Sequence, residues 1–325
     1  MRIKNILISI VMVGLASYGG LKLYMWDKAK KDIDKVFAGI TYGMKAGFAL
    51  DVQANYERIS TSIYGPVGIR GVKIRIPSIE EELTVDEFKL LERDFDVDLQ
   101  KGNIPLRLHF QITGLKMTTS FMEKLDSSIR KIQKKNNIPA YDPQSVFVRL
   151  GYHELISRSG NLWDLGYDQV SMDLEFDMII DPVTKEATFK YHQKIQDLGE
   201  LSARVKVADM SGSLQNAVLG MRIKDATITF TDDTYIERFL QLYASEQNMD
   251  LEEYRKQLPT IIQEDFSAKK LKLSEESVKN ILAFIQNPEK VIFTIYPYRP
   301  VGIESIKHYK PGDVPMLLNL QAHLE

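Results

Sequence analysis

Histidines are the first residues to consider for metal or acid–base chemistry, and their positions form no recognised site. The chain has five: His109, His153, His192, His308 and His323. None lies in an HExxH motif or at another spacing typical of a metal site. His153 precedes Glu154 in an expected helix, whereas His109 and His192 fall on the polar sides of expected strands. We therefore assign these histidines structural or solvated positions.

A row of carboxylates, Asp173, Glu175 and Asp177, could suggest a calcium site. Alternate positions of a strand place the three side chains on one face about 7 Å apart, and no flanking segment encloses an ion. Lys190 and Lys194 stand on the next expected strand and are natural cross-strand partners. We therefore expect this row to be a solvated face.

Motifs for covalent or phosphate chemistry are absent from the sequence. The chain has no cysteine, which excludes disulfides, thiolate zinc sites, a cysteine nucleophile and a lipoprotein acylation site. No serine stands in a Gly-x-Ser-x-Gly turn, and neither a Walker loop nor GxGxxG occurs. We predict a non-enzymatic protein with no catalytic residue, cofactor or metal. An enzyme whose residues lie far apart in the sequence is the alternative.

The overall charge argues against a nucleic-acid partner. The 42 Lys and Arg residues balance 44 Asp and Glu residues, whereas nucleic-acid-binding domains carry a basic excess. At 325 residues the chain can bury one large core or two moderate ones.

The N-terminus predicts a membrane anchor. A short basic head over residues 1–4 precedes an uncharged run over 6–21, and apolar residues continue to Trp26. A helix to that point spans roughly 30 Å, enough to cross a bilayer. A cleaved signal peptide is the rival interpretation, because small residues occur over 16–20, but no clear cleavage site follows them. We predict a transmembrane signal anchor over residues 1–26, in a bacterial inner membrane, with the body in the periplasm.

Residues 27–50 are expected to form a helix, because apolar residues recur every three or four positions from Ile33 to Phe48. We interpret it as a stalk helix or a helix docked on the body, and the alternative is a contact between copies in the membrane plane. Residues 51–325 contain no low-complexity segment or linker, which predicts one periplasmic α+β body.

Strand patterns dominate this body. Apolar residues alternate over 72–76, 106–112, 170–180, 187–191, 201–207, 221–230 and 291–295. The 221–230 run slips once at Lys224-Asp225, as a β-bulge would do. Turns are expected at glycines 65, 68, 71, 102 and 114.

Helices are predicted from Ser120, over 141–156, over 235–244, from Asp250 and over 274–286. Pro259 is expected to kink or end the helix that starts at Asp250. A last apolar run, 314–320, is expected to end the sheet. The predicted fold is α+β: an extended, mostly antiparallel, curved sheet with helices on one side.

The strand over 170–180 places a continuous apolar side opposite the carboxylate row. With one residue of the 106–112 strand, it supplies the candidate apolar ligand face: Phe110, Met172, Leu174, Phe176 and Met178. Methionines are adaptable side chains that occur at permissive apolar surfaces. Such a face covers an ordinary core, a protein partner or a lipid, and the sequence leaves these three open.

Several segments resemble membrane-anchored bacterial envelope proteins of the broad YdgA and AsmA-like kind. The resemblance rests on the hairpin over 170–192 and on a few punctuating residues: Gly151-Tyr152, Tyr167-Asp168, Gly199, Pro297 and Pro300. It implies an envelope location and, because large AsmA-like proteins are regarded as β-grooves that carry lipid, a role in lipid handling. It brings no catalytic motif, and this chain is far shorter than those proteins.

Two functions are consistent with these features. The first is a structural or assembly component of the cell envelope, suited by an anchor, a stalk and a body without chemistry. The alternative is a module that binds or transfers lipid or another hydrophobic ligand on the candidate face. The expected partners are the inner membrane, through the anchor, and an envelope protein, a second copy at the stalk, or lipid.

Overall fold

The structure is a computed structural model of the chain. It describes residues 51–60, 67–77, 80–93, 106–121, 165–210, 220–306 and 308–325, and helical positions at 27, 29–31, 33, 34, 124 and 127. The predicted anchor over 1–26, the helix predicted over 141–156, His153, Gly65 and Gly102 lie outside the described residues.

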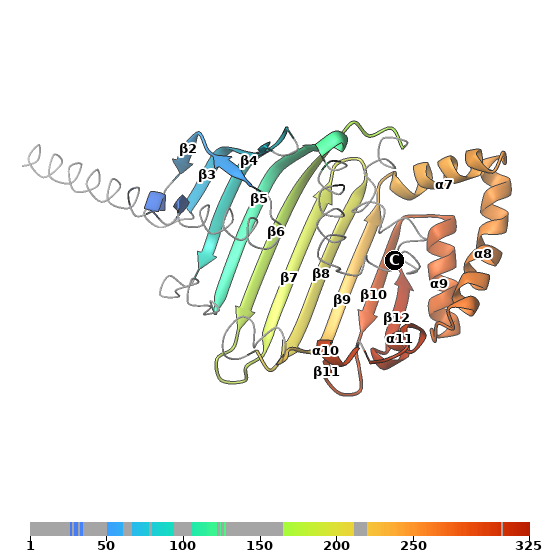
Figure 1. The fold of residues 1–325 in the computed structure, drawn as a ribbon. Coiled ribbons are helices and arrows are strands. Elements are labelled where there is room, and N and C mark those ends of the chain that lie inside the picture. The colour runs from blue at the N-terminus through green and yellow to red at the C-terminus, as the bar shows by residue number, and fades with distance from the viewer. Residues whose placement is uncertain are drawn as a thin grey trace, which may run out of the picture.

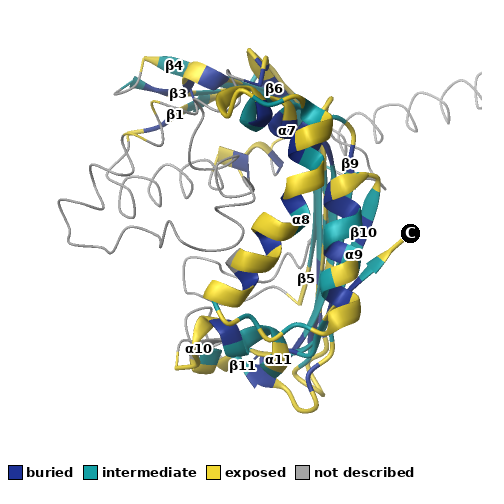
Figure 2. Cartoon of the chain, turned by 90° about the vertical axis from the view of Figure 1, so that its right-hand side faces the viewer, coloured by how far each residue is buried: buried dark blue, intermediate teal, exposed yellow. Residues whose placement is uncertain are grey.

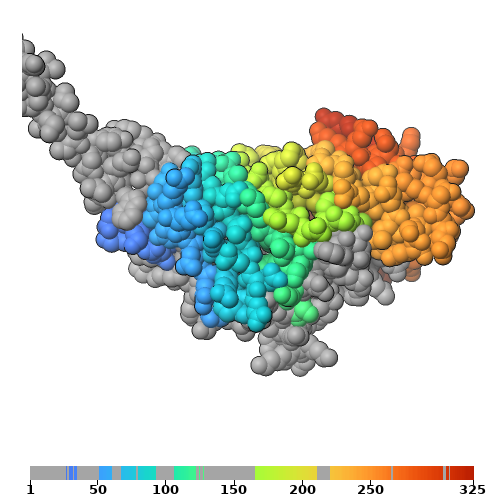
Figure 3. Space-filling model, turned by 90° about the horizontal axis from the view of Figure 1, so that it is seen from above, coloured from blue at the N-terminus to red at the C-terminus, as the bar shows by residue number. Residues whose placement is uncertain are grey.

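A twelve-stranded antiparallel sheet forms the body (Figure 1). Its main path follows the order β1-β3-β4-β5-β6-β7-β8-β9-β10-β12, while β2 pairs with β3 and β11 pairs with β9. The strands are β1 Gln53–Asn55, β2 Arg58–Ser60, β3 Val67–Ile76, β4 Glu81–Arg93, β5 Arg107–Thr118, β6 Gln169–Ile180, β7 Ala187–Ile195, β8 Gly199–Ala208, β9 Arg222–Asp232, β10 Lys290–Ile295, β11 Val301–Gly302 and β12 Leu320–Leu324. Because strand order follows the chain, the described residues run in sequence from one end of the molecule to the other (Figure 3).

Three helices cover the C-terminal end of the sheet: α7 Tyr235–Glu246, α8 Leu251–Ala268 and α9 Glu275–Gln286 (Figures 1 and 2). Side chains cap the first turns of α8 and α9. Asp250 Oδ1 accepts from the Glu253 N–H at 2.8 Å, and Ser274 Oγ accepts from the Ser277 N–H at 3.1 Å. Of the two alternatives predicted for Pro259, an end of the helix is wrong, because α8 continues through it.

The predicted curved, antiparallel sheet with helices on one side is confirmed for the described residues. Cross-strand partners share a face, and one row joins Ile69 of β3 through β4–β8 to Phe230 of β9. Phe230 packs edge-on against Phe284 of α9, at 6.0 Å between ring centroids, whereas Ile69 packs with Ile33 of the N-terminal helical segment. Helices α7–α9 and the helical segment of Ile33 therefore lie on the same, apolar face.

The helical positions between 27 and 34 contact the body. Ile33 is buried with Ile69, Val72 and Val85, and the Tyr56 hydroxyl donates to Asp34 at 2.9 Å. This part of the predicted stalk is therefore docked on β3 and β4. None of the helices in the described ranges is long and apolar enough to cross a membrane.

Three glycines expected at turns lie inside strands instead: Gly68, Gly71 and Gly114. Gly71 and Gly114 have φ values of 63° and 62°, and the register places them on either side of Asp86 in β4. Only glycine adopts this backbone without strain, and such positions in the two strands that flank β4 let a sheet bend. Figure 2 shows β3 and β4 crossing the top of the molecule while β9 and β10 run down it.

Two other expectations need correction. The run over 314–320 does not form the last strand: Val314–Leu317 is the short helix α11, preceded by the 3₁₀ turn Pro311–Asp313, and the sheet ends at β12. Pro315 has no amide proton for a strand ladder and suits a first helical turn, which explains the difference. The helix predicted from Ser120 begins at Thr119, because Thr118 Oγ1 caps the Phe121 N–H at 3.0 Å.

Candidate functional site

The apolar face is built from two neighbouring cross-strand rows through the centre of the sheet. The first row is Leu90, Phe110, Phe176, Tyr191, Ala203, Ile228 and Phe293. The second is Phe88, Ile112, Leu174, Gln193, Leu201, Phe230 and Val291. Neither row contains a charged side chain. The period of two that the sequence predicts in single strands therefore extends across seven strands as one surface.

Four aromatic rings from four adjacent strands lie along this face. The centroid distances are 5.8 Å between Phe88 and Phe110, 5.3 Å between Phe110 and Phe176, and 6.3 Å between Phe176 and Phe189. We call these four residues the phenylalanine row. Ring pairs at such distances contribute about 0.5–1.5 kcal/mol each beyond the area that they bury.

The five residues of the candidate ligand face fall into different environments. Met172 packs against the cluster formed by α7–α9, and Met178 is 7% exposed in a separate cluster at the other end of β6. Phe110, Leu174 and Phe176 are half-buried in the centre. The structure therefore assigns Met172 and Met178 to core and keeps Phe110 and Leu174 on a shared central surface with Phe176, which also packs against the Met178 cluster.

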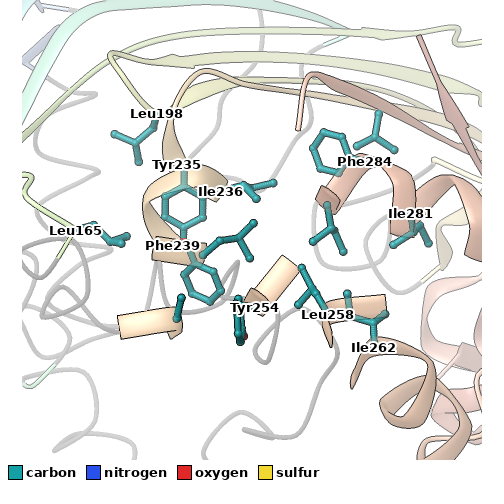
Figure 4. Close-up of a cluster of buried hydrophobic side chains, with 14 of the residues drawn as sticks. Leu165, Leu198, Tyr235, Ile236, Phe239, Tyr254, Leu258, Ile262, Ile281 and Phe284 are labelled. Carbon is teal, nitrogen blue, oxygen red and sulfur yellow. The ribbon is translucent and has the colours of Figure 1, made fainter. Parts of the chain in front are cut away.

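Helices α7–α9 stop short of that centre. Their cluster contains Tyr235, Phe239, Tyr254, Leu258 and Phe284, with Val170 and Val291 from the sheet (Figure 4). Phe110, Leu174 and Phe176 do not belong to it, nor to the cluster that contains Ile33. Within the described ranges, these three side chains therefore pack in no cluster that includes a helix.

Two polar side chains interrupt the apolar face, and sequence reasoning missed one of them. The Tyr191 hydroxyl donates to Gln193 Oε1 at 2.8 Å, and Gln193 Nε2 donates to the Met172 sulfur at 3.4 Å. Burial raises the pKa of Tyr191, which keeps its hydroxyl protonated. The signal for Gln193 was available: it follows Phe189 and Tyr191 at the same two-residue spacing, where another apolar residue is expected.

The opposite face is polar and paired. His109 Nε2 lies 2.8 Å from Glu175 Oε1, and Gln111 donates to Glu175 Oε2 at 3.0 Å. These hydrogen bonds, with His109 the larger influence, hold the pKa of Glu175 below its usual value. Lys190, one of the two lysines predicted as cross-strand partners of the carboxylate row, pairs with Asp177 at 3.0 Å.

One predicted pairing on this face is wrong. Lys194 lies opposite Asp173 in the register but pairs with Glu200 at 2.5 Å, while Asp173 Oδ1 accepts from the Gly114 N–H at 2.7 Å. The β5 bulge beside Gly114 turns that amide toward Asp173, and a sequence pattern does not reveal it. No group of three or more His, Asp and Glu residues within the described ranges is arranged to hold a metal ion.

Asp232 is the described acid with the largest change in ionisation. Burial raises its pKa to about 6, although both carboxylate oxygens accept from the Ile236 N–H, at 3.0 and 3.3 Å. The carboxylate thus lies beside the first turn of α7, which begins at Tyr235. We therefore assign Asp232 to capping α7 rather than to chemistry.

A separate hollow of 820 Å³ lies between α8 and α9, away from the predicted face. Pro259, Phe266 and Leu282 are among its apolar walls, and Lys270 and Glu275 lie at it. It brings together no histidine and no buried acid. We therefore place the candidate site on the central sheet and not in this hollow.

Some residues of the family resemblance have clear structural roles. The Tyr167 hydroxyl lies 2.9 Å from Thr234 Oγ1, and the Arg238 guanidinium lies 4.5 Å from the centre of the Tyr167 ring. A Cβ at Gly199 would lie 2.3 Å from the Thr231 carbonyl oxygen, so only glycine fits there. Gly151-Tyr152 lie outside the described residues.

Comparison with known proteins adds a boundary but no activity. A family sequence profile described as "Uncharacterized protein" matches residues 169–325, a little under half of the chain. The match begins at the first residue of β6 and therefore includes Leu174, Phe176 and Gln193. No curated protein matches the chain.

Proposed function

We propose that this protein is a membrane-anchored, non-enzymatic envelope protein that binds a lipid or another apolar ligand on the centre of its sheet. The supporting observation is the phenylalanine row, in which Phe110 and Phe176 are half-buried and pack in no cluster with a described helix. Contiguous apolar surface of this kind is typical of sites that bind ligands, partners or membranes.

The opposite face supports the choice of an apolar ligand. Its charged side chains pair with one another, as in the Asp177–Lys190 and Lys194–Glu200 ion pairs, and they are stable in contact with water. The central rows of the apolar face offer ring and aliphatic surface without charge. A ligand on that face gains free energy mainly from the apolar area removed from water, at about 25 cal/mol per Å².

Site-specific photo-crosslinking tests this proposal in the full chain. A benzophenone side chain replaces Phe176 in one variant and Glu175 in the control variant. Glu175 is the neighbouring residue of β6, and its side chain lies on the opposite face. After irradiation of cells, the adducts are identified by mass spectrometry. We expect lipid adducts at position 176 and at position 110, and none at position 175.

Other adducts would change the conclusion. A crosslink from position 176 to a peptide of the same chain outside the neighbouring strands β5 and β7 would make the face an ordinary core and would contradict ligand binding. A single foreign protein there would instead favour the assembly function.

A second candidate, the structural or assembly component, is supported by a different surface. At the rim where β6 and β10 end, several apolar side chains are exposed: Val183, Tyr296, Tyr298, Tyr309 and Met316. Tyr298 is 96% exposed, between Pro297 and Arg299. Tyrosine and arginine are enriched in protein interfaces, so this rim suits a protein partner.

The same crosslinker at position 298 tests the assembly candidate. A discrete protein adduct is expected there, and Ile261, which is 42% exposed on α8, provides a control position outside this rim. Equal, diffuse labelling at both positions would count against a specific partner at the rim.

A further inference from the structure

The amide of Gln193 is placed to recognise a ligand group, and it is incompletely used within the protein. Its Oε1 accepts from the Tyr191 hydroxyl, which fixes the side chain so that Nε2 points the other way. Its only described acceptor is the Met172 sulfur at 3.4 Å, and a thioether is a weak acceptor. An oxygen acceptor would therefore be a better partner for this donor.

Gln193 also lies where the central surface meets the helix-covered core. Two residues further along β7, Ile195 packs against the cluster of α7–α9, and Met172 does the same on β6. Two residues earlier, Tyr191 lies opposite Phe176 of the phenylalanine row. A chain that leaves the phenylalanine row and runs along β7 toward the helices would pass Tyr191 and meet the Gln193 amide.

The rows around this amide limit which group it accepts. Its cross-strand neighbours are Leu174 and Leu201, and neither central row carries a charge. A charged headgroup at this depth would lose its hydration without a counter-charge, which costs several kcal/mol. A neutral carbonyl oxygen loses much less and gains the amide proton.

We infer that the ligand is an amphiphile whose part on the sheet is uncharged and contains an ester or amide carbonyl. This carbonyl accepts a hydrogen bond from Gln193 Nε2, in place of the Met172 sulfur. The inference rests on the proposed function, because it names the ligand class of the same face. Any charged part of the ligand lies outside the two central rows.

The test compares two photoreactive probes on the full chain in detergent. Both carry a diazirine at the same position of a chain of equal length, and one contains an ester where the other is pure hydrocarbon. Labelling of the β6–β7 hairpin is measured as the ester-to-hydrocarbon ratio. Partition into micelles is the same for every variant, so it cancels when the ratios are compared.

We expect Gln193→Leu to lower this ratio about tenfold, for two reasons. The ester probe loses its hydrogen bond to the amide, and the hydrocarbon probe no longer covers an amide that has no partner. Gln111→Leu is the matched control, since Gln111 pairs with Glu175 on the opposite face, and the ratio should stay as in the wild type. Tyr191→Phe keeps the ring but frees Gln193 Oε1, and an intermediate decrease is expected.

The outcomes separate the two proposals. If both probes label the wild-type hairpin and Gln193→Leu leaves the ratio unchanged, the carbonyl contact is overturned while ligand binding stands. If neither probe labels the wild-type hairpin, the ligand-binding function itself is overturned, and the inference with it. Thermal unfolding of each variant confirms that the compared proteins are folded.

Discussion

At the scale of the residue, similar side chains on one face of this sheet have different roles. Phe176 is half-buried in the phenylalanine row, whereas Phe284 of α9 is 3% exposed among residues of three helices and the sheet. The first contacts rings on neighbouring strands, and the second fills a closed core. Truncation should distinguish a surface that receives a ligand from one that is already covered.

We expect Phe284→Ala to lower the free energy of unfolding by about 3–5 kcal/mol, as in closed cores, and Phe176→Ala to lower it by about 1–2 kcal/mol. The difference arises because truncating a half-buried ring removes less apolar contact and leaves a smaller enclosed cavity. Urea denaturation measures both values. Equal losses for the two variants would mean that the row is core and would contradict ligand binding.

Asp232 gives the chain a specific pH dependence. Its pKa is raised to about 6 in the folded state, whereas the ordinary value of an unfolded chain is near 4. Between these two pH values the folded state therefore holds a proton that the unfolded state has lost. This contribution to stability is complete below pH 4 and disappears as the pH rises through 6. Asp232→Asn keeps an oxygen for the Ile236 N–H and carries no charge to bury.

Asp232→Asn should therefore stabilise the protein at pH 7.5, by up to roughly 3 kcal/mol, and leave stability nearly unchanged at pH 4. Thermal unfolding at the two pH values measures this, with the exposed Asp233→Asn as control. A loss of stability at pH 7.5 would mean that the charge favours the α7 N-terminus more than burial opposes it.

At the scale of the element, the sequence predicts periodic structure well and irregular contacts poorly. The slip at Lys224-Asp225 is confirmed, because Lys206 faces Asp225 and Val207 faces Ile223. An alternating pattern carries its own register, so a broken period exposes a bulge. The apolar run over 314–320 has no such alternation. It forms a short helix with Pro315 in its first turn.

The candidate site was predictable only in part, for the same reason. The two-residue period places Leu174 and Phe176 on one face, but it does not say that α7–α9 cover Met172 and leave Phe176 outside their cluster. That depends on where helices far along the chain pack. Gln193 was missed because its role depends on the Tyr191 and Met172 side chains beside it, not on a motif.

Helix α9 also protects the last edge of the sheet. Ser277 Oγ accepts from the Ala322 N–H of β12 at 3.1 Å, and Asn280 Nδ2 donates to the Ala322 carbonyl at 2.7 Å. These backbone groups face away from β10 and would otherwise be free to pair with another strand. Ser277 is 1% exposed, and its hydroxyl oxygen also accepts from the Ser274 hydroxyl at 2.8 Å, which links this edge to the start of α9.

Ser277→Ala should show how far the stability of β12 depends on its hydrogen bonds to α9. It leaves the Ala322 amide buried without an acceptor, and we expect a loss of about 1–3 kcal/mol in stability. Hydrogen exchange of β12 should accelerate, while Ser305→Ala, which removes an exposed turn hydrogen bond, should leave it unchanged. Unchanged exchange in Ser277→Ala would show that the edge is held by β10 pairing alone.

At the scale of the whole molecule, the proposed function depends on the chain being held beside a source of lipid. The docked contact of Ile33 with β3 and β4 ties the start of the body to residues 27–34, directly after the predicted anchor. The opposite end of the sheet is closed by α7–α9, and the phenylalanine row lies between these two covered regions. An anchored chain would keep this central surface close to the membrane.

The anchor itself is tested by fractionation of cells that express the full chain. We expect the full chain to stay in the membrane pellet after alkaline carbonate extraction, because an apolar helix of roughly 30 Å spans the bilayer. A chain that lacks residues 1–26 should move to the supernatant, and mass spectrometry should find Met1 or Arg2 at the N-terminus of the full chain. A mature N-terminus within residues 17–27, with the protein in the supernatant, would identify a cleaved signal peptide. The lipid would then have to reach the phenylalanine row of a protein that is free to diffuse.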